Sequence, residues 1–174
     1  MTTGFDAALV SLAREVAERL ERTGRQLVLA ESCTAGLVAA ALATVPGISR
    51  HLCGSAVVYQ ERTKSEWLSV PAELLADRGA VSAEVAAAMT AGVLDRTPYA
   101  DLAAAVTGHL GPDAPTELDG QVYIAIQTRD QQPIVRHFRL GDGATEESSS
   151  LPARQHRQIE AAHLVLELIL AAIR

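Results

Sequence analysis

Two candidate nucleophiles, Ser32 and Cys33, follow directly after a short apolar run at residues 27–30. The run has the composition of a buried strand, and small helix-forming residues begin at Ala35. A strand that passes into a helix through Ser, Cys and Thr places unpaired backbone N–H groups beside hydroxyls, which suits an anion or a developing oxyanion. An ordinary helix cap without chemistry explains the same residues equally well, because Ser and Thr are common capping residues.

A candidate base, Lys64, lies five residues after Tyr59. It is the only lysine of the chain, whose other fourteen basic residues are arginines. An ammonium group can lose its proton when it is desolvated, whereas a guanidinium group effectively does not. Lys64 could therefore serve as a base or proton relay; the alternative is a surface lysine left by compositional chance.

Composition bounds the class of protein. The chain has 174 residues, of which 48% are hydrophobic and 21% charged, so we expect one soluble globular domain over residues 1–174. The net charge of −6 and the scattered arginines argue against a nucleic-acid partner, whose binding needs a basic face, but allow a small anionic ligand.

Other classes of site and location are also disfavoured. The two cysteines have no metal-ligand spacing, and we find no cluster that predicts a metal site. No apolar run approaches the roughly twenty residues that span a bilayer, so no membrane association is expected. The first residues, MTTGFD, lack the regions of a signal peptide, and we expect a cytoplasmic protein.

Periodicity and breakers predict the order of the elements. Helices are expected at 5–23, from 35 to about 45, at 60–68, in a turn led by Pro71, at 83–95 and at 155–173; strands at 27–30, 54–59, 101–106, 120–128 and 134–139; and a loop at 141–152. Helices that alternate with strands indicate an α/β fold, a three-layer α/β/α sandwich with a mostly parallel mixed sheet that includes one hairpin.

Three predicted strands end on residues with hydroxyl groups. These residues are Ser32, Tyr59 and Thr107. If the three strands are parallel neighbours, their carboxyl ends open onto one crevice, which is where open α/β sheets bind ligands.

A set of motifs runs through nearly the whole chain in the order and spacing of one known pattern. Two motifs are specific: E-S-C-T-A-G at residues 31–36 and the pair Tyr59-x4-Lys64. The supporting motifs are Pro46-Gly47-Ile48-Ser49, Gly54, Gly79-Ala80-Val81-Ser82, Thr107-Gly108 and Gly120-x-Val122-Tyr123. On these residues the sequence resembles the CinA C-terminal domain family, which includes the bacterial nicotinamide-mononucleotide amidohydrolases.

The resemblance implies a fold, an assembly and an activity. The family's fold is a three-layer α/β/α sandwich, and its members are commonly oligomeric, so a homo-oligomer (dimer or higher) is expected. Its characterised activity is hydrolysis of the carboxamide of nicotinamide mononucleotide to nicotinate mononucleotide and ammonia. The implied partner is therefore a small-molecule nucleotide substrate, with no cofactor.

Carried over residue by residue, the resemblance implies that Ser32 is the nucleophile and that Tyr59 and Lys64 activate it. A Ser–Lys or Ser–Tyr–Lys arrangement is a known substitute for the Ser–His–Asp triad. Backbone N–H groups around residues 33–35 are candidates for holding the oxyanion. Cys33 is the rival nucleophile, although a Cys beside a Ser is more often a buried small residue.

The same resemblance implies a wider set of substrate-binding residues. That set consists of Glu31, Cys33, Thr34, Ala35, Gly36, Thr107, Gly108, His109 and Arg157. Within it, the two threonines are candidates for binding the ribose phosphate or for orienting the amide.

Two departures from the family pattern leave alternatives open. After Thr107-Gly108 the family usually continues Ile-Ala-Gly-Pro, whereas this chain has a bulkier loop at residues 109–115. The family's Gly-Asp-Arg before the last helix is Gly-Asp-Gly at residues 141–143, and Arg154 or Arg157 is the candidate substitute. A changed substrate, or a non-catalytic ligand-binding or regulatory domain on the same fold, is therefore the alternative to the amidohydrolase.

Overall fold

The structure of the protein, a computed structural model, describes residues 6–141 and 151–173. Six α-helices are present there: α1 (Ala7–Thr23), α2 (Leu37–Ala43), α3 (Glu61–Leu68), α4 (Ala72–Arg78), α5 (Ala83–Arg96) and α6 (Ala153–Ala172). Five strands and one 3-10 turn complete the described elements: β1 (Leu27–Glu31), η1 (Ile48–Arg50), β2 (Leu52–Val57), β3 (Leu102–Gly108), β4 (Gln121–Thr128) and β5 (Ile134–Arg139). Most of the predicted loop at 141–152 lies outside the described residues.

The five strands form one mixed sheet in the order β2-β1-β3-β4-β5. β1 pairs in parallel with β2 and β3, whereas β4 pairs antiparallel with β3 and β5. Only β4 therefore runs against the other strands, and the predicted α/β class with its mostly parallel mixed sheet and one hairpin is confirmed.

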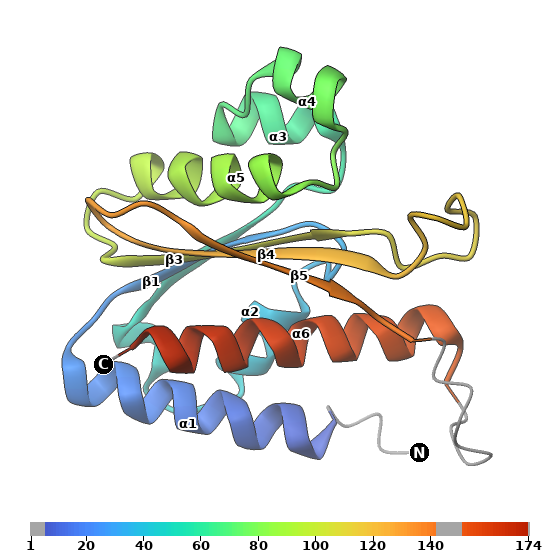
Figure 1. Ribbon diagram of the computed structural model, residues 1–174. Coiled ribbons are helices and arrows are strands. Elements are labelled where there is room, and N and C mark those ends of the chain that lie inside the picture. Colours follow the sequence, from blue (N-terminus) through green and yellow to red (C-terminus); the bar gives the residue numbers. More distant parts are fainter. Residues whose placement is uncertain (1–5, 142–150, 174) are drawn as a thin grey trace.

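Helices cover both faces of this sheet. In Figure 1, α1, α2 and α6 lie on one side of the strands and α3, α4 and α5 lie on the other. The helices α1, α2 and α6 also pack against one another, and α5 packs against β1, β3 and β4. No helix within residues 6–141 and 151–173 combines the length and the apolar character that crossing a bilayer requires.

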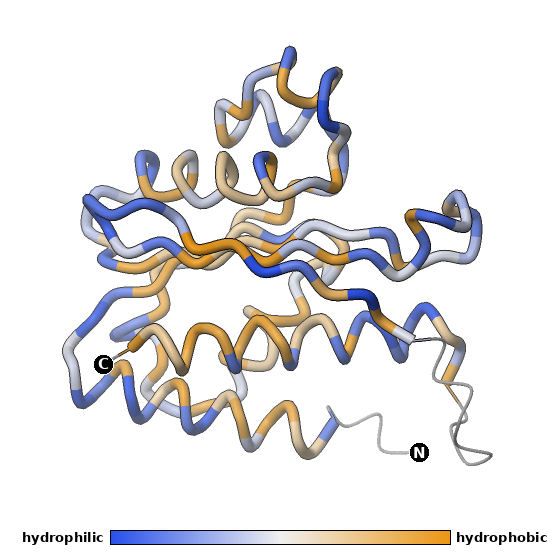
Figure 2. The backbone as a smooth tube through the Cα atoms, in the orientation of Figure 1, coloured by the Kyte–Doolittle hydropathy of each residue, from blue (hydrophilic) through white to orange (hydrophobic). Residues whose placement is uncertain are grey.

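β1 is buried along its whole length because it lies inside the sheet and is covered on both faces. Leu27 and Leu29 join the core beneath α1, α2 and α6, whereas Val28 and Ala30 join the core beneath α5. This alternation explains why the sequence of the strand is continuously apolar rather than alternating. Figure 2 shows the same concentration of hydrophobic residues along the central strands and α6.

The ends of α1 show how local sequence sets the element bounds. The carboxylate of Asp6 accepts a hydrogen bond of 2.8 Å from the N–H of Leu9 and caps the first turn. Gly24 ends the helix with a φ of 68°, a left-handed conformation that glycine adopts without a Cβ clash.

Strand bounds near the predicted crevice differ from the sequence prediction by a few residues. β2 ends at Val57, so Tyr59 lies beyond the strand, whereas β3 continues through Thr107 and Gly108. β3 is longer because its last residues pair with Tyr123 and Val122 of β4, a long-range pairing that local propensity does not encode.

Gly92 lies where α5 packs closely against α3. A Cβ atom at this position would lie 1.9 Å from the carbonyl oxygen of Leu68, which is backbone and cannot turn away. We expect Gly92→Ala to lower the free energy of unfolding by about 2–4 kcal/mol, measured by urea denaturation.

Gly141→Ala is the matched control for that measurement. A Cβ atom there would meet nothing within 4 Å, so this variant should stay within about 0.5 kcal/mol of the wild type. Equal stability of Gly92→Ala and the wild type would contradict the close approach of the two helices.

Candidate active site

The hydroxyl of Ser32 and the amine of Lys64 form the centre of the candidate site. Ser32 follows the carboxyl end of β1, and Lys64 reaches it from the first half of α3. The Nζ atom of Lys64 lies 2.9 Å from the Oγ atom of Ser32, and both side chains are buried. A hydroxyl within hydrogen-bond distance of an amine is the geometry that a nucleophile and its base require.

The remaining contacts of Lys64 are main-chain carbonyls. Its Nζ atom lies 2.9 Å from the oxygen of Val58 and 3.4 Å from the oxygen of Tyr59. A neutral amine has two N–H donors, which these carbonyls would accept, and one lone pair, which is left for the Ser32 hydroxyl. An ammonium group would donate to all three oxygens, whereas a neutral amine would donate to the two carbonyls and accept from Ser32, so the three contacts fit either protonation state.

Burial shifts the protonation of Lys64 in the direction that a base needs. Desolvation lowers the pKa of the amine below its ordinary value of 10.5, and attraction to Cys33 and Glu61 opposes this only in part. Among the described residues, no carboxylate lies within ion-pair distance of Nζ. A buried amine without a counter-ion holds its proton less tightly than a surface lysine.

Burial makes Cys33 a weaker candidate nucleophile than Ser32. Its side chain is 4% exposed, and burial raises the pKa of the thiol to about 12. Because the thiolate is the nucleophilic form of cysteine, a thiol with this pKa is a poor nucleophile at neutral pH. Of the two candidates in the sequence, the geometry favours Ser32.

Glu31 lies beneath the turn that carries Ser32 and is only 1% exposed. Its two carboxylate oxygens accept five hydrogen bonds of 2.8–3.1 Å, from the hydroxyls of Thr34 and Ser55 and from the backbone N–H groups of residues 36, 38 and 39. A negative charge at the amino end of α2 also interacts favourably with the helix dipole. In the structure Glu31 holds the start of α2 in place, whereas the family resemblance implies a role in substrate binding.

The turn from Ser32 to Gly36 is held in a compact shape. Ala35 and Gly36 have positive φ angles of 52° and 95°, and the N–H of Ala35 donates to the oxygen of Ser32. The N–H of Ala35 is thus already used. In the part of the chain that is described, no protein group accepts from the N–H groups of Cys33 and Thr34, which leaves these two as candidate oxyanion donors.

A pocket with a volume of about 400 Å³ opens above these groups. Its described lining consists of Ser32, Cys33, Tyr59, Lys64, Ala80, Val81, Thr107, Gly108, His109, Leu110, Gly111, Asp113, Ala114, Pro115 and Arg154. The volume falls in the range of small-ligand sites. The predicted crevice at the carboxyl ends of β1, β2 and β3 therefore exists.

Tyr59 and Arg154 meet at the mouth of this pocket. Tyr59 is 53% exposed, and the Arg154 guanidinium donates to its hydroxyl and to the carbonyl oxygen of Gly111. Tyr59 contacts Lys64 only through its main-chain carbonyl. The phenol thus contacts a cation rather than the Ser32–Lys64 pair, and its predicted role in activating Ser32 stays a prediction.

Arg157, which the sequence places among the substrate-binding residues, contacts protein groups instead. It is 4% exposed and holds the carboxylate of Asp119 through two hydrogen bonds of 2.8 and 2.9 Å. This contact lowers the pKa of Asp119. The described pocket lining includes Arg154 but not Arg157, so Arg154 is the cation that the geometry offers to an anionic ligand.

The other predicted site residues fall into two groups. Thr107, Gly108 and His109 line the pocket, and the hydroxyl of Thr107 donates to the carbonyl oxygen of Ala80 at 2.8 Å. Thr34, Ala35 and Gly36 form the turn and are absent from the described lining. Arg154 carries no sequence signal beyond its place as a candidate substitute for the family's arginine.

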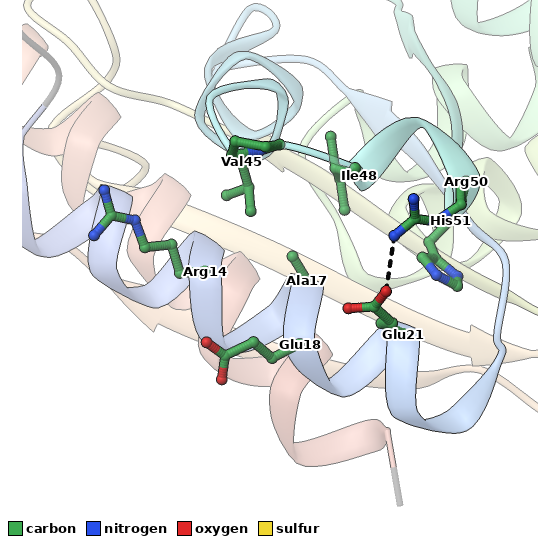
Figure 3. Close-up of a pocket in the computed structure, with 10 residues that line it drawn as sticks. Arg14, Ala17, Glu18, Glu21, Val45, Ile48, Arg50 and His51 are labelled. Carbon is green, nitrogen blue, oxygen red and sulfur yellow. Dashed lines mark hydrogen bonds and ion pairs between the residues drawn. The ribbon is translucent and has the colours of Figure 1, made fainter.

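A smaller pocket of about 230 Å³ lies between α1 and the loop that leads into η1 (Figure 3). Arg50 and Glu21 face each other across it at 2.7 Å, and both side chains are mostly exposed. The pocket has no counterpart to the buried Ser32–Lys64 pair. Within the described residues, no three His, Cys, Asp or Glu side chains converge as they do around a metal ion.

Comparison with known proteins assigns the family. The model of the CinA C-terminal domain matches residues 9–155. A CinA-like protein of Myxococcus xanthus is 48% identical over 118 residues, which are 66% of this chain and 27% of that protein. A CinA-like protein of Desulfotalea psychrophila is 42% identical over 167 residues, which are 95% of this chain and 39% of that protein. The chain therefore belongs to the CinA C-terminal domain family.

Solved structures agree with this assignment. The competence/damage inducible protein CihA from Agrobacterium tumefaciens superposes with a TM-score of 0.87 at 31% identity, with 98% of each chain covered. A CinA superfamily protein from Klebsiella pneumoniae gives a TM-score of 0.84 at 26% identity, with 95% of this chain and 97% of that chain covered. The chain spans only 27% and 39% of the two curated relatives, so they contain a large part that has no counterpart here.

Glu31→Gln tests the hydrogen bonds that Glu31 makes beneath the candidate nucleophile. An amide keeps the size of the side chain but turns an N–H₂ group toward donors that need an acceptor, which leaves buried N–H groups unsatisfied. We expect a loss of about 2–4 kcal/mol in the free energy of unfolding, measured by urea denaturation. Glu21→Gln, which changes a carboxylate that is 63% exposed, is the control and should have little effect. Equal losses in the two variants would refute the assignment.

The lowered pKa of Lys64 predicts a pH dependence of stability. Between the lowered native pKa and 10.5 the unfolded chain binds more protons than the native chain, so the stability contributed by this group rises with pH. Relative to Lys64→Met, the wild type should therefore gain stability across this window and should reach a plateau above it. Urea denaturation of both proteins over a pH series measures the difference in their free energies of unfolding. Groups that titrate identically in both proteins cancel from this difference. A difference that stays constant with pH would show that the amine is not desolvated.

Proposed function

We propose that the protein is a serine amidohydrolase that converts nicotinamide mononucleotide and water to nicotinate mononucleotide and ammonia. The observation that carries the proposal is the 2.9 Å contact between the Ser32 hydroxyl and the buried amine of Lys64. The carboxamide substrate follows from membership in a family that includes nicotinamide-mononucleotide amidohydrolases. The names of the relatives are CinA-like protein and competence-damage inducible protein, and they specify no reaction.

In the first half of the proposed reaction, neutral Lys64 takes the proton of the Ser32 hydroxyl while Oγ attacks the carboxamide carbon. The resulting tetrahedral oxyanion accepts hydrogen bonds from the backbone N–H groups of Cys33 and Thr34. The Lys64 ammonium then gives its proton to the departing nitrogen. Ammonia leaves, and an ester between Ser32 and the carboxyl group of nicotinate mononucleotide remains.

In the second half, Lys64 is again neutral and takes a proton from an attacking water molecule. The water oxygen forms a bond to the ester carbon, the bond to Oγ breaks, and Oγ recovers a proton from Lys64. The products are nicotinate mononucleotide and the free enzyme. Each step needs an unprotonated base, a form that a desolvated lysine reaches at lower pH than a surface lysine and that an arginine effectively never reaches.

Arg154 is the proposed contact for the phosphate group of the substrate. A guanidinium can donate two parallel hydrogen bonds to phosphate oxygens, and this one already faces the pocket mouth. Tyr59 would then act through Arg154, by holding the guanidinium in place. Thr107 and His109 line the same pocket and are proposed to contact the ribose or the amide.

The proposal extends to partners and location, for which the sequence is the only support. We propose a small-molecule nucleotide partner, a homo-oligomeric assembly and a cytoplasmic location. The curated relatives are longer than the part that matches this chain, and that additional part is a place where other activities can reside.

Ammonia release from nicotinamide mononucleotide tests the proposed reaction. The wild type should release ammonia, and Ser32→Ala should lower kcat at least 10³-fold, because the nucleophile is removed. A coupled assay of ammonia under saturating substrate measures both. Ser65→Ala, one residue from Lys64 on α3, is the matched control and should keep wild-type turnover.

The other outcomes of this assay are also informative. Turnover that persists in Ser32→Ala would move the nucleophile elsewhere, and Cys33→Ala would then be the next variant. No ammonia from folded wild-type protein would refute nicotinamide mononucleotide as substrate and would favour a changed substrate or a binding role.

A further inference from the structure

Gln158 of α6 connects the last helix to the turn that carries the nucleophile. Its Nε2 atom lies 3.2 Å from the carbonyl oxygen of Cys33 and 3.2 Å from that of Thr34. The amide nitrogen must face this pair, because the amide oxygen would be repelled by two carbonyl acceptors. The side chain is only partly exposed, and it is separated from the turn by more than 120 residues of sequence.

This contact fixes the direction of one candidate oxyanion donor. In a trans peptide the C=O and the following N–H point in opposite directions. Because the carbonyl of Cys33 points toward α6, the N–H of Thr34 points away from α6. The N–H of Ala35 is already bound to the oxygen of Ser32, so it cannot take this role.

The turn is therefore held from two sides by groups of different charge. The carboxylate of Glu31 binds the N–H groups at the start of α2, and the neutral amide of Gln158 binds the carbonyls of the turn. A second carboxylate at position 158 would repel both carbonyls and would place negative charge near a developing oxyanion. A neutral donor provides the hydrogen bonds without that cost.

We propose that Gln158 is a positioning residue that holds the N–H of Thr34 in the direction of the oxyanion formed at Ser32. The inference rests on the proposed function in one respect, namely that Ser32 is the nucleophile. It adds a residue outside the motifs on which the family resemblance rests, and it assigns α6 a part in the chemistry.

The test uses an alkyl fluorophosphonate as the probe, because it reports on Ser32 without requiring the natural substrate. The Oγ atom of Ser32 forms a bond to phosphorus, fluoride leaves, and the hydroxyl proton passes to Lys64. Negative charge grows on the phosphoryl oxygen in the transition state, so the same donors that hold an amide oxyanion are expected to accelerate labelling. Intact-protein mass spectrometry gives the rate.

We expect Gln158→Met to label about 10- to 100-fold more slowly than the wild type, and Gln158→Glu to be at least as slow. With nicotinamide mononucleotide, kcat should fall by a similar factor while KM changes little, because the oxyanion exists only beyond the ground state. Gln155→Met, on the exposed side of the same helix, is the matched control and should label at the wild-type rate. Circular dichroism confirms that each variant is folded.

The outcomes separate this inference from the proposed function. Equal labelling rates in folded Gln158→Met and wild type would overturn the inference alone. Slower labelling of the variant, combined with no ammonia from the wild type, would support the inference and refute the substrate. A wild type that is not labelled at Ser32 would overturn both.

Discussion

The buried hydrogen bond between Lys64 and Ser32 is the interaction on which the site depends. An amine that is 1% exposed and has no carboxylate partner among the described residues is costly to keep charged. Two main-chain carbonyls accept N–H groups of this amine and hold it beside the Ser32 hydroxyl. Both carbonyls belong to the segment that leads from β2 to α3, so the path of the chain after β2 sets the position of the Lys64 amine.

Sheet topology explains why this pair can form at all. β1 lies between β2 and β3 with the same direction, so Ser32 emerges next to the ends of both neighbours. β2 is followed by α3, which lies on the opposite side of the sheet from α2 (Figure 1). The Lys64 side chain of α3 reaches Ser32 just after the end of β1. The carboxylate of Glu31 accepts hydrogen bonds from the start of α2, so Ser32 lies between β1 and a helix whose first turn is held in place.

Much of this arrangement could be predicted from the sequence, and the exceptions share a cause. The order of helices and strands follows from local sequence patterns, whereas the pairing of Ser32 with Lys64 was implied by the resemblance to the CinA C-terminal domain family. Glu31 was expected in the ligand site, but its five acceptor contacts involve mainly backbone N–H groups, which leave no mark in the sequence. Arg154 and Arg157 are three residues apart on one helix, and only the docking of α6 decides which faces the pocket.

The docking of α6 therefore has consequences for chemistry as well as for the core. Its apolar face packs against α1, α2, β3 and β4, which fixes the axis of the helix. Arg154 and Gln158 are four residues apart and therefore lie on one face of this helix. With the axis fixed, Arg154 reaches the mouth of the pocket and Gln158 reaches the turn that carries Ser32. Arg157 projects elsewhere and ties the helix to Asp119, next to the loop that forms one wall of the pocket. A helix from the far end of the chain thus sets the position of the Arg154 cation and contacts the turn at residues 32–36, while β1 and α3 position the candidate nucleophile Ser32 and its candidate base Lys64.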